Sequence, residues 1–151
     1  MKALYDADAD LRKVAEKTIA VIGFGSQGKA QAQNLRDSGM NVVIGLREGS
    51  KSADDARKEG FEVLSPDKAA EKANFIMMLI PDEEQPAMYM KSVAPHLKAG
   101  KYLGFSHGFG IHFGTIVPPK DVNVLMIAPK GPGRLVRTEY ANGRVRMRAV
   151  M

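Results

Sequence analysis

The chain has 151 residues, of which 44% are hydrophobic and 26% charged, and its formal net charge at pH 7 is +5. This length is typical of one domain and this composition of a globular protein, which excludes the disordered and collagen-like classes. No apolar run approaches the roughly 20 residues that a membrane-spanning helix needs, and residues 1–8 lack the apolar segment of a secretory signal. The absence of cysteine excludes disulfides, thiolate metal sites and cysteine nucleophiles. We therefore expect a cytoplasmic protein without a membrane partner.

The positive charge is concentrated at the C-terminal end. Residues 129–151 hold six basic residues and one acidic residue, whereas residues 1–128 hold 16 of each. A nucleic-acid-binding domain usually carries a basic face on its folded body. A neutral body with a basic tail therefore argues against nucleic acid as the partner. The charge of the tail is the one feature that supports nucleic-acid binding as an alternative.

In chain order, short apolar runs alternate with segments of helical composition. Strands are expected at residues 18–23, 41–46, 61–64, 75–80, 102–105 and 122–128. Helices are expected at residues 26–38, 52–60 and 83–97, and from the Ser65-Pro66 pair onward. Alternation with short loops predicts an α/β protein with a doubly wound, mostly parallel sheet of the Rossmann type, in a single domain. The nine methionines fall largely in apolar runs and are expected to fill the core.

A glycine-rich turn follows the first expected strand. Residues 23–28, Gly-Phe-Gly-Ser-Gln-Gly, match the pattern G-x-G-x-x-G between a strand and a helix, which is the context that gives this pattern weight. Gly23 permits the tight turn, Gly25 lets backbone approach a pyrophosphate, and Gly28 allows close packing of helix on strand. Phosphates then bind the free N–H groups at the helix N-terminus. The turn predicts a dinucleotide cofactor.

The loop after the second expected strand indicates which dinucleotide. NAD-preferring sites usually carry an acidic residue there for the ribose hydroxyls. This chain places Arg47 at that point, followed by Ser50, Lys51 and Ser52. A forked guanidinium with neighbouring hydroxyls suits a 2′-phosphate, and Ser52 also suits a helix N-cap. Glu48 is discordant because an inward carboxylate would repel the phosphate. The loop favours NADP(H) over NAD(H).

Three later segments follow expected strands and should meet at the same sheet edge, where ligands bind in this fold. They are residues 81–85 (Pro-Asp-Glu-Glu-Gln), residues 106–109 (Ser-His-Gly-Phe) and residues 129–133 (Pro-Lys-Gly-Pro-Gly). Of the three histidines, His107 is the one that emerges beside glycine at a strand end. This position makes His107 a candidate catalytic residue, with a purely structural histidine as the alternative.

These stretches resemble the N-terminal, NADP-binding domain of ketol-acid reductoisomerase (acetohydroxyacid isomeroreductase). Further matching stretches lie at residues 5–11, 45–50, 112–114, 117–119, 128–133 and 136–140. The resemblance implies an oxidoreductase of isoleucine and valine biosynthesis, that is, of branched-chain amino-acid biosynthesis. Such an enzyme isomerises and reduces 2-acetolactate or 2-aceto-2-hydroxybutyrate with NADPH and magnesium.

The resemblance also implies roles for individual residues. His107 would be the active-site histidine. The cofactor would be bound by the glycine-rich turn, the loop after the second strand, the segment after the fourth strand and a glycine after the last strand: Gly23, Phe24, Gly25, Ser26, Gln27, Gly28, Arg47, Ser50, Ser52, Asp82, Glu83, Glu84, Gln85 and Gly133.

The resemblance ends at Tyr140, so we expect a cofactor-binding domain at residues 1–140 and a divergent basic tail at residues 141–151. The helical C-terminal domain that supplies magnesium ligands in the family has no counterpart here, and no metal ligands can be assigned. We expect a truncated or frameshifted product, or one part of a split enzyme, inactive alone and completed by a C-terminal domain chain or a homo-oligomer. The alternatives are a stand-alone, non-catalytic NADP-binding module and a different small dehydrogenase that completes its site by oligomerising.

Overall fold

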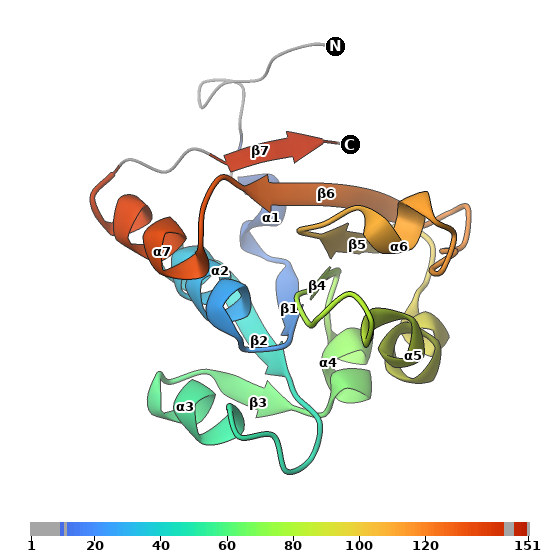
Figure 1. Cartoon of the computed structure of the whole chain (residues 1–151), viewed down its shortest axis with the longest axis horizontal. Coiled ribbons are helices and arrows are strands. Elements are labelled where there is room, and N and C mark those ends of the chain that lie inside the picture. The colour runs from blue at the N-terminus through green and yellow to red at the C-terminus, as the bar shows by residue number, and fades with distance from the viewer. Residues whose placement is uncertain (1–9, 11, 144–146, 151) are drawn as a thin grey trace.

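A seven-stranded sheet forms the centre of the structure (Figure 1). The computed structural model describes residues 10, 12–143 and 147–150, so most of the matching stretch at residues 5–11 and two arginines of the basic tail, Arg144 and Arg146, lie outside the described residues. The strands run in the order β3-β2-β1-β4-β5-β6-β7. Their bounds are β1 Thr18–Ile22, β2 Asn41–Gly45, β3 Glu62–Leu64, β4 Phe75–Met78, β5 Tyr102–Phe105, β6 Asn123–Pro129 and β7 Met147–Val150.

The first six strands are parallel, and β7 pairs antiparallel with β6. From β1 the chain moves outward to β2 and β3, then crosses back to β4 on the other side of β1. The order of connection therefore reverses between β1 and β4. In an open parallel sheet, ligands bind beyond the carboxyl ends of the strands at such a reversal. The expected Rossmann-type sheet is confirmed.

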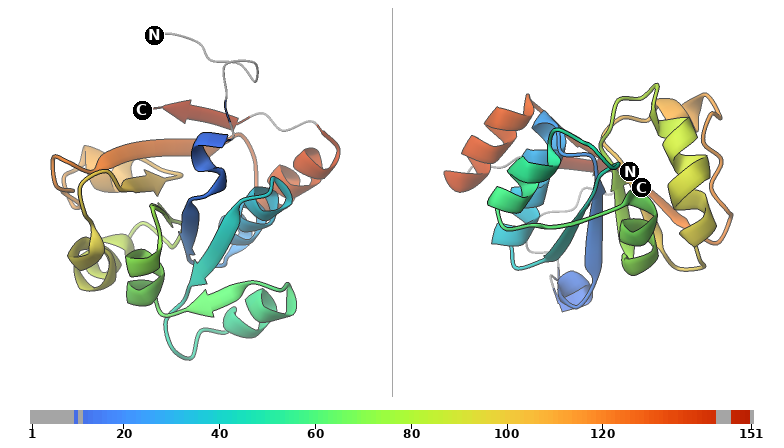
Figure 2. Two further views of the ribbon diagram at one scale, coloured as in Figure 1. Left: turned by 180° about the vertical axis from the view of Figure 1, so that it is seen from behind. Right: turned by 90° about the horizontal axis from the view of Figure 1, so that it is seen from below.

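Helices cover both faces of the sheet, as the view from below in Figure 2 shows. Helices α2 (Ser26–Asp37), α3 (Ala53–Lys58) and α7 (Gly133–Ala141) lie on one side. Helix α4 (Pro66–Lys72) and the helical segment that begins with α5 (Gln85–Met88) lie on the other. Among the described residues, no helix combines the length and apolar character needed to cross a membrane.

Each face of the sheet has its own hydrophobic core, because successive side chains of a strand point to opposite faces. On β1, Ala20 and Ile22 belong to the cluster under α4, whereas Ile19 and Val21 belong to the cluster under α2 and α3. Burial on both faces explains why β1, β2 and β4 appear in the sequence as continuous apolar runs rather than alternating ones.

Two expected elements end differently. Strand β4 stops at Met78 and not at residue 80, because the chain turns toward Pro81, whose ring restricts the preceding residue. The helix expected at residues 83–97 starts at Gln85 and changes type along its length. It passes from α5 into the π-helical turn η2 (Tyr89–Val93) and the 3-10 turn η3 (Ala94–His96). Pro95 lacks the N–H that an α-helical ladder needs there.

Four elements were not expected from the sequence. They are α1 (Arg12–Ala15), α6 (Phe109–His112), α7 and β7. Helix α7 begins directly after Pro132, at a Pro-Gly pair that resembles a loop in the sequence. Because α7 packs along α2, it completes the surroundings of the glycine-rich turn.

Candidate functional site

The glycine-rich turn lies where β1 meets the end of β4. Gly23 has a φ of +103°, and a Cβ there would come within 2.8 Å of the Leu79 carbonyl oxygen. A Cβ on Gly28 would collide with the carbonyl of Gly23, so the first turn of α2 sits directly on the strand end. At Gly25 a Cβ would meet nothing within 4 Å. The turn is therefore closed toward the protein and open toward solvent at its middle glycine, as an approaching phosphate requires.

The side chain of Phe24 is buried beside this opening. It is 5% exposed and contacts Phe61 edge-on, with ring centroids 5.6 Å apart. Phe24 also lines a pocket between α2 and α7, where Nζ of Lys29 lies 5.9 Å from the centroid of the Phe24 ring.

The loop between β6 and α7 packs on the same turn. A Cβ on Gly133 would lie 2.6 Å from Oγ of Ser26, and closer still to the Ser26 backbone. Gln27 donates from Nε2 to the carbonyl of Gly131 at 2.9 Å. Glycine at position 133 thus lets α7 begin directly against α2, and the structure brings Gly133 together with the expected glycine-rich turn.

Two functional candidates that the sequence reasoning missed are buried polar residues of α2, Gln31 and Asn34, at 3% and 6% exposure. Gln31 donates from Nε2 to Oγ of Ser106 at 3.0 Å and approaches Oε1 of Gln27 at 3.3 Å. Gln27, Gln31 and Asn34 follow the four-then-three spacing of one helix face. This polar row was the signal that could have revealed them, and it ties α2 to the loop that carries His107.

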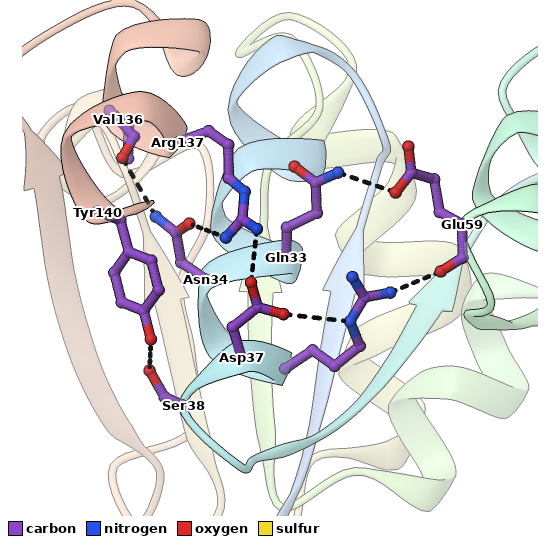
Figure 3. Close-up of polar contacts among 9 residues, drawn as sticks. Gln33, Asn34, Asp37, Ser38, Glu59, Val136, Arg137 and Tyr140 are labelled. Carbon is purple, nitrogen blue, oxygen red and sulfur yellow. Dashed lines mark hydrogen bonds and ion pairs between the residues drawn. The ribbon is translucent and has the colours of Figure 1, made fainter. Parts of the chain in front are cut away.

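Asn34 belongs to a polar network that joins α2 to α7 (Figure 3). Its Nδ2 donates to the carbonyl of Val136 at 3.3 Å, and its Oδ1 accepts from Nη1 of Arg137 at 2.9 Å. Arg137 also binds Asp37 at 2.5 Å, and this hydrogen bond holds the pKa of the Asp37 carboxyl below its ordinary value. The network fixes α7, and with it Gly133, in position beside the turn.

An open pocket of about 460 Å³ lies between α2 and α7. Its lining includes Gly25, Ser26, Lys29, Gly133 and Arg134. The carboxylates of Asp55 and Glu59 hydrogen-bond to Lys29 and raise its pKa. The pocket flanks the outer side of the glycine-rich turn and leaves Arg47 and His107 outside its lining.

The loop after β2 places Arg47 on the surface. Its guanidinium Nη1 lies 3.6 Å from Oε2 of Glu84, which belongs to the segment after β4. Both side chains are well exposed, so a charged ligand can reach them. Ser50 and Ser52 are half-buried on the same loop, and the backbone N–H of Ser52 approaches Oγ of Ser50 at 3.4 Å. Ser52 is the N-cap residue of α3, but its hydroxyl makes no capping hydrogen bond.

The loops after β4 and β5 bring His107 and Asp82 together. Nδ1 of His107 lies 3.0 Å from Oδ2 of Asp82. Asp82 also accepts at Oδ1 from Nε2 of Gln85 at 3.2 Å. The His107 ring is largely exposed and lies nearly parallel to the ring of Phe109, with centroids 6.5 Å apart. Glu83, the residue after Asp82, is exposed.

A divalent cation does not fit the donor set seen here. Within residues 10, 12–143 and 147–150, no three histidine, aspartate or glutamate side chains lie close enough together to hold a metal ion. The carboxylate of Asp82 is engaged with His107 and Gln85, and that of Glu84 with Arg47.

Comparison with known proteins identifies the family. The model of the acetohydroxy acid isomeroreductase NADPH-binding domain matches residues 13–150. This chain belongs to that family. The acetohydroxy acid isomeroreductase match extends through residues 141–150, the segment in which β7 extends the sheet. The domain described above is therefore one that binds a nicotinamide cofactor.

A solved NADH-preferring ketol-acid reductoisomerase from an uncultured archaeon is 51% identical, with a TM-score of 0.92. The alignment covers 99% of this chain and 47% of that one. A semialdehyde dehydrogenase NAD-binding protein from Cupriavidus necator, at 23% identity, and 3-hydroxyisobutyrate dehydrogenase from Mycobacterium tuberculosis, at 18%, both have TM-scores of 0.65. These alignments cover 76% and 81% of this chain and 42% and 43% of those proteins. The two more distant likenesses show the fold alone. The chain spans less than half the length of each of these structures.

Proposed function

We propose that this chain is the NADP(H)-binding part of a ketol-acid reductoisomerase that reduces 2-acetolactate or 2-aceto-2-hydroxybutyrate in the cytoplasm. The observation that carries the proposal is the convergence of three expected groups at one sheet edge. The open middle of the glycine-rich turn, the Arg47 guanidinium and the His107 imidazole follow the carboxyl ends of three parallel strands, β1, β2 and β5.

In this proposal each group has a defined task. The N–H groups at the start of α2 bind the pyrophosphate beside Gly25, and Gly133 lines the nicotinamide end. Arg47, with Ser50 and Ser52, binds the 2′-phosphate. Asp82, Glu83, Glu84 and Gln85 border the cofactor, and His107 handles a proton of the substrate. The bound nicotinamide supplies the hydride for the reduction.

The metal-dependent isomerisation needs ligands that the described residues do not provide. We infer that a unit equivalent to the second half of a family member, or another copy in an oligomer, contributes them. A non-catalytic NADP-binding module is the competing proposal. NADH is the competing cofactor, because Glu84 faces Arg47 and the 51% identical relative prefers NADH.

Cofactor titration of the purified chain, followed by fluorescence, tests the proposal. NADPH should bind more tightly than NADH. The matched variant is Gly25→Ala, since its Cβ fits the folded chain without contact but occupies the approach to the phosphates. Its melting temperature without cofactor should equal that of the parent, while its affinity for both cofactors falls. Failure of the parent to bind either cofactor would overturn the proposal.

A further inference from the structure

The loop after β4 is built around one buried amide. Gln85 is 4% exposed, and its Nε2 donates both to the carbonyl of Ile80, at 2.9 Å, and to Oδ1 of Asp82, at 3.2 Å. Both amide hydrogens are thereby used inside the loop. The Asp82 carboxylate is held at one oxygen, which leaves the other oxygen, Oδ2, directed at His107.

We propose that Asp82 and Gln85 are positioning residues that set the tautomer of His107. A carboxylate accepts hydrogen bonds and donates none. At 3.0 Å from Oδ2, an unprotonated Nδ1 would turn its lone pair toward the lone pairs of the carboxylate, so the tautomer of His107 with its hydrogen on Nδ1 is favoured. A neutral imidazole has one N–H, so its second nitrogen, Nε2, is left with a free lone pair.

The tautomer decides what Nε2 can do. An unprotonated Nε2 accepts a proton or a hydrogen bond from a hydroxyl group, whereas in the opposite tautomer Nε2 carries the hydrogen and donates a hydrogen bond. The His107 side chain is 69% exposed, so this nitrogen is accessible to a ligand. That the ligand is a hydroxyl-bearing substrate beside a nicotinamide rests on the proposed function. The tautomer itself does not, because it is set by the protein alone.

The inference differs from a direct cofactor role for Asp82 and Gln85, which the family resemblance implies. In the positioning role, the two side chains act through His107. Replacing them should change the state of the imidazole. In a direct role, replacing them should change cofactor affinity and leave the imidazole as it was.

Ring nitrogen NMR of the ¹⁵N-labelled full chain measures the tautomer without cofactor. The spectra are recorded at alkaline pH, and His107→Gln assigns the signal. His96 and His112 are internal references, since the loop after β4 touches neither in the hydrogen bonds and ion pairs of the described residues. We expect the Nδ1–H form to dominate at His107.

Asp82→Asn should invert this tautomer. The Gln85 amide still requires an acceptor, so the oxygen of the introduced carboxamide turns toward it and the carboxamide nitrogen faces His107. Two donors cannot face each other, so Nδ1 loses its hydrogen and Nε2 gains it. Gln85→Met keeps the buried shape but removes the donor, and should give a mixture of forms. Glu83→Gln changes the charge of the same loop and should leave the His107 tautomer unchanged.

An Nε2–H form in the parent chain would overturn the proposal, and this result needs no variant to fold. So would an unchanged His107 signal in Asp82→Asn when the His96 and His112 signals show that the variant is folded. Loss of cofactor affinity with an unchanged tautomer would assign the direct role instead. A dominant Nδ1–H form in a chain that binds no cofactor would support the positioning role and overturn the proposed function.

Discussion

In the proposed function, the choice between NADP(H) and NAD(H) depends most directly on Arg47. Its side chain is exposed in the loop that follows β2, where the proposal places the 2′-phosphate. We expect Arg47→Ala to weaken the binding of NADPH by about 1.5–3 kcal/mol, or roughly 10- to 150-fold, because a charge-assisted contact is lost. NADH affinity should hardly change. Titration calorimetry with both cofactors checks this, with Lys58→Ala as a control that removes a cation from α3. Equal losses for both cofactors would contradict the assignment.

Glu84 bears on the same choice from the other side, because its carboxylate already pairs with Arg47 at 3.6 Å. Exposed ion pairs are worth about 0.2–1 kcal/mol. Glu84→Gln should therefore raise the affinity for NADPH by about 1.4- to 5-fold and leave the affinity for NADH nearly unchanged. The gain should shrink as salt is added, because exposed charges are screened. Glu48→Gln is the matched control. If Glu48→Gln produces the gain instead, the neighbouring carboxylate of the β2 loop is the one that opposes phosphate binding.

Positions marked by a local pattern were predictable in this part of the fold, whereas contacts between residues far apart in the chain were not. The glycines are recognisable through a pattern six residues long, and Arg47 and His107 because they follow apolar runs. Gln31 and Asn34 find their partners 75 and 102 positions along the chain. No local pattern specifies that a helix will be covered there by Ser106 and Val136. The Asp82–His107 contact likewise depends on β4 and β5 being neighbours.

Helix α2 depends on α7 for more than apolar packing. We expect Asn34→Ala to cost about 1–3 kcal/mol of unfolding free energy, because the Val136 carbonyl loses its side-chain donor and Arg137 loses a partner in a partly buried contact. Urea denaturation measures it. Gln33→Ala, one position away and bonded only to Glu59 among the described side chains, should cost clearly less. Equal costs would show that helix propensity, and not the network, sets the loss.

The helices and strands were predictable to different degrees for physical reasons. Strands β1, β2, β4 and β5 are mostly buried and lie in apolar runs. The expected position of each of the six parallel strands is confirmed within a few residues. Helix α7 was missed because Pro132 and Gly133 are loop residues by local preference, and the close approach to Ser26 overrides that preference. The change of helix type between Gln85 and His96 reflects proline placement and tertiary packing, which hydrophobic periodicity does not encode.

The isolated chain should bind cofactor and yet fail to turn over. Polarising a ketone and a neighbouring oxygen for an alkyl shift requires a Lewis acid, and the described residues offer no cluster to hold one. A positioned proton-transfer group contributes only about 10²–10⁴-fold. The assay is NADPH consumption with 2-acetolactate and magnesium, with and without a separately expressed second half of a family member. Activity appearing only on mixing is the expected result, and magnesium-dependent turnover by the lone chain would contradict it.

Strand β7 has a consequence for how molecules meet one another. It pairs antiparallel with residues 126–129 and so occupies the outer side of β6. An unpaired strand at the margin of a sheet is a template for the backbone of another molecule. In the described part of the chain β7 is itself the outermost strand, but it has only four residues, whereas β6 has seven. Short strands at the margin of a sheet limit pairing between molecules. Deleting residues 147–151 would expose the longer β6 as the margin, and light scattering should then report self-association that grows with concentration.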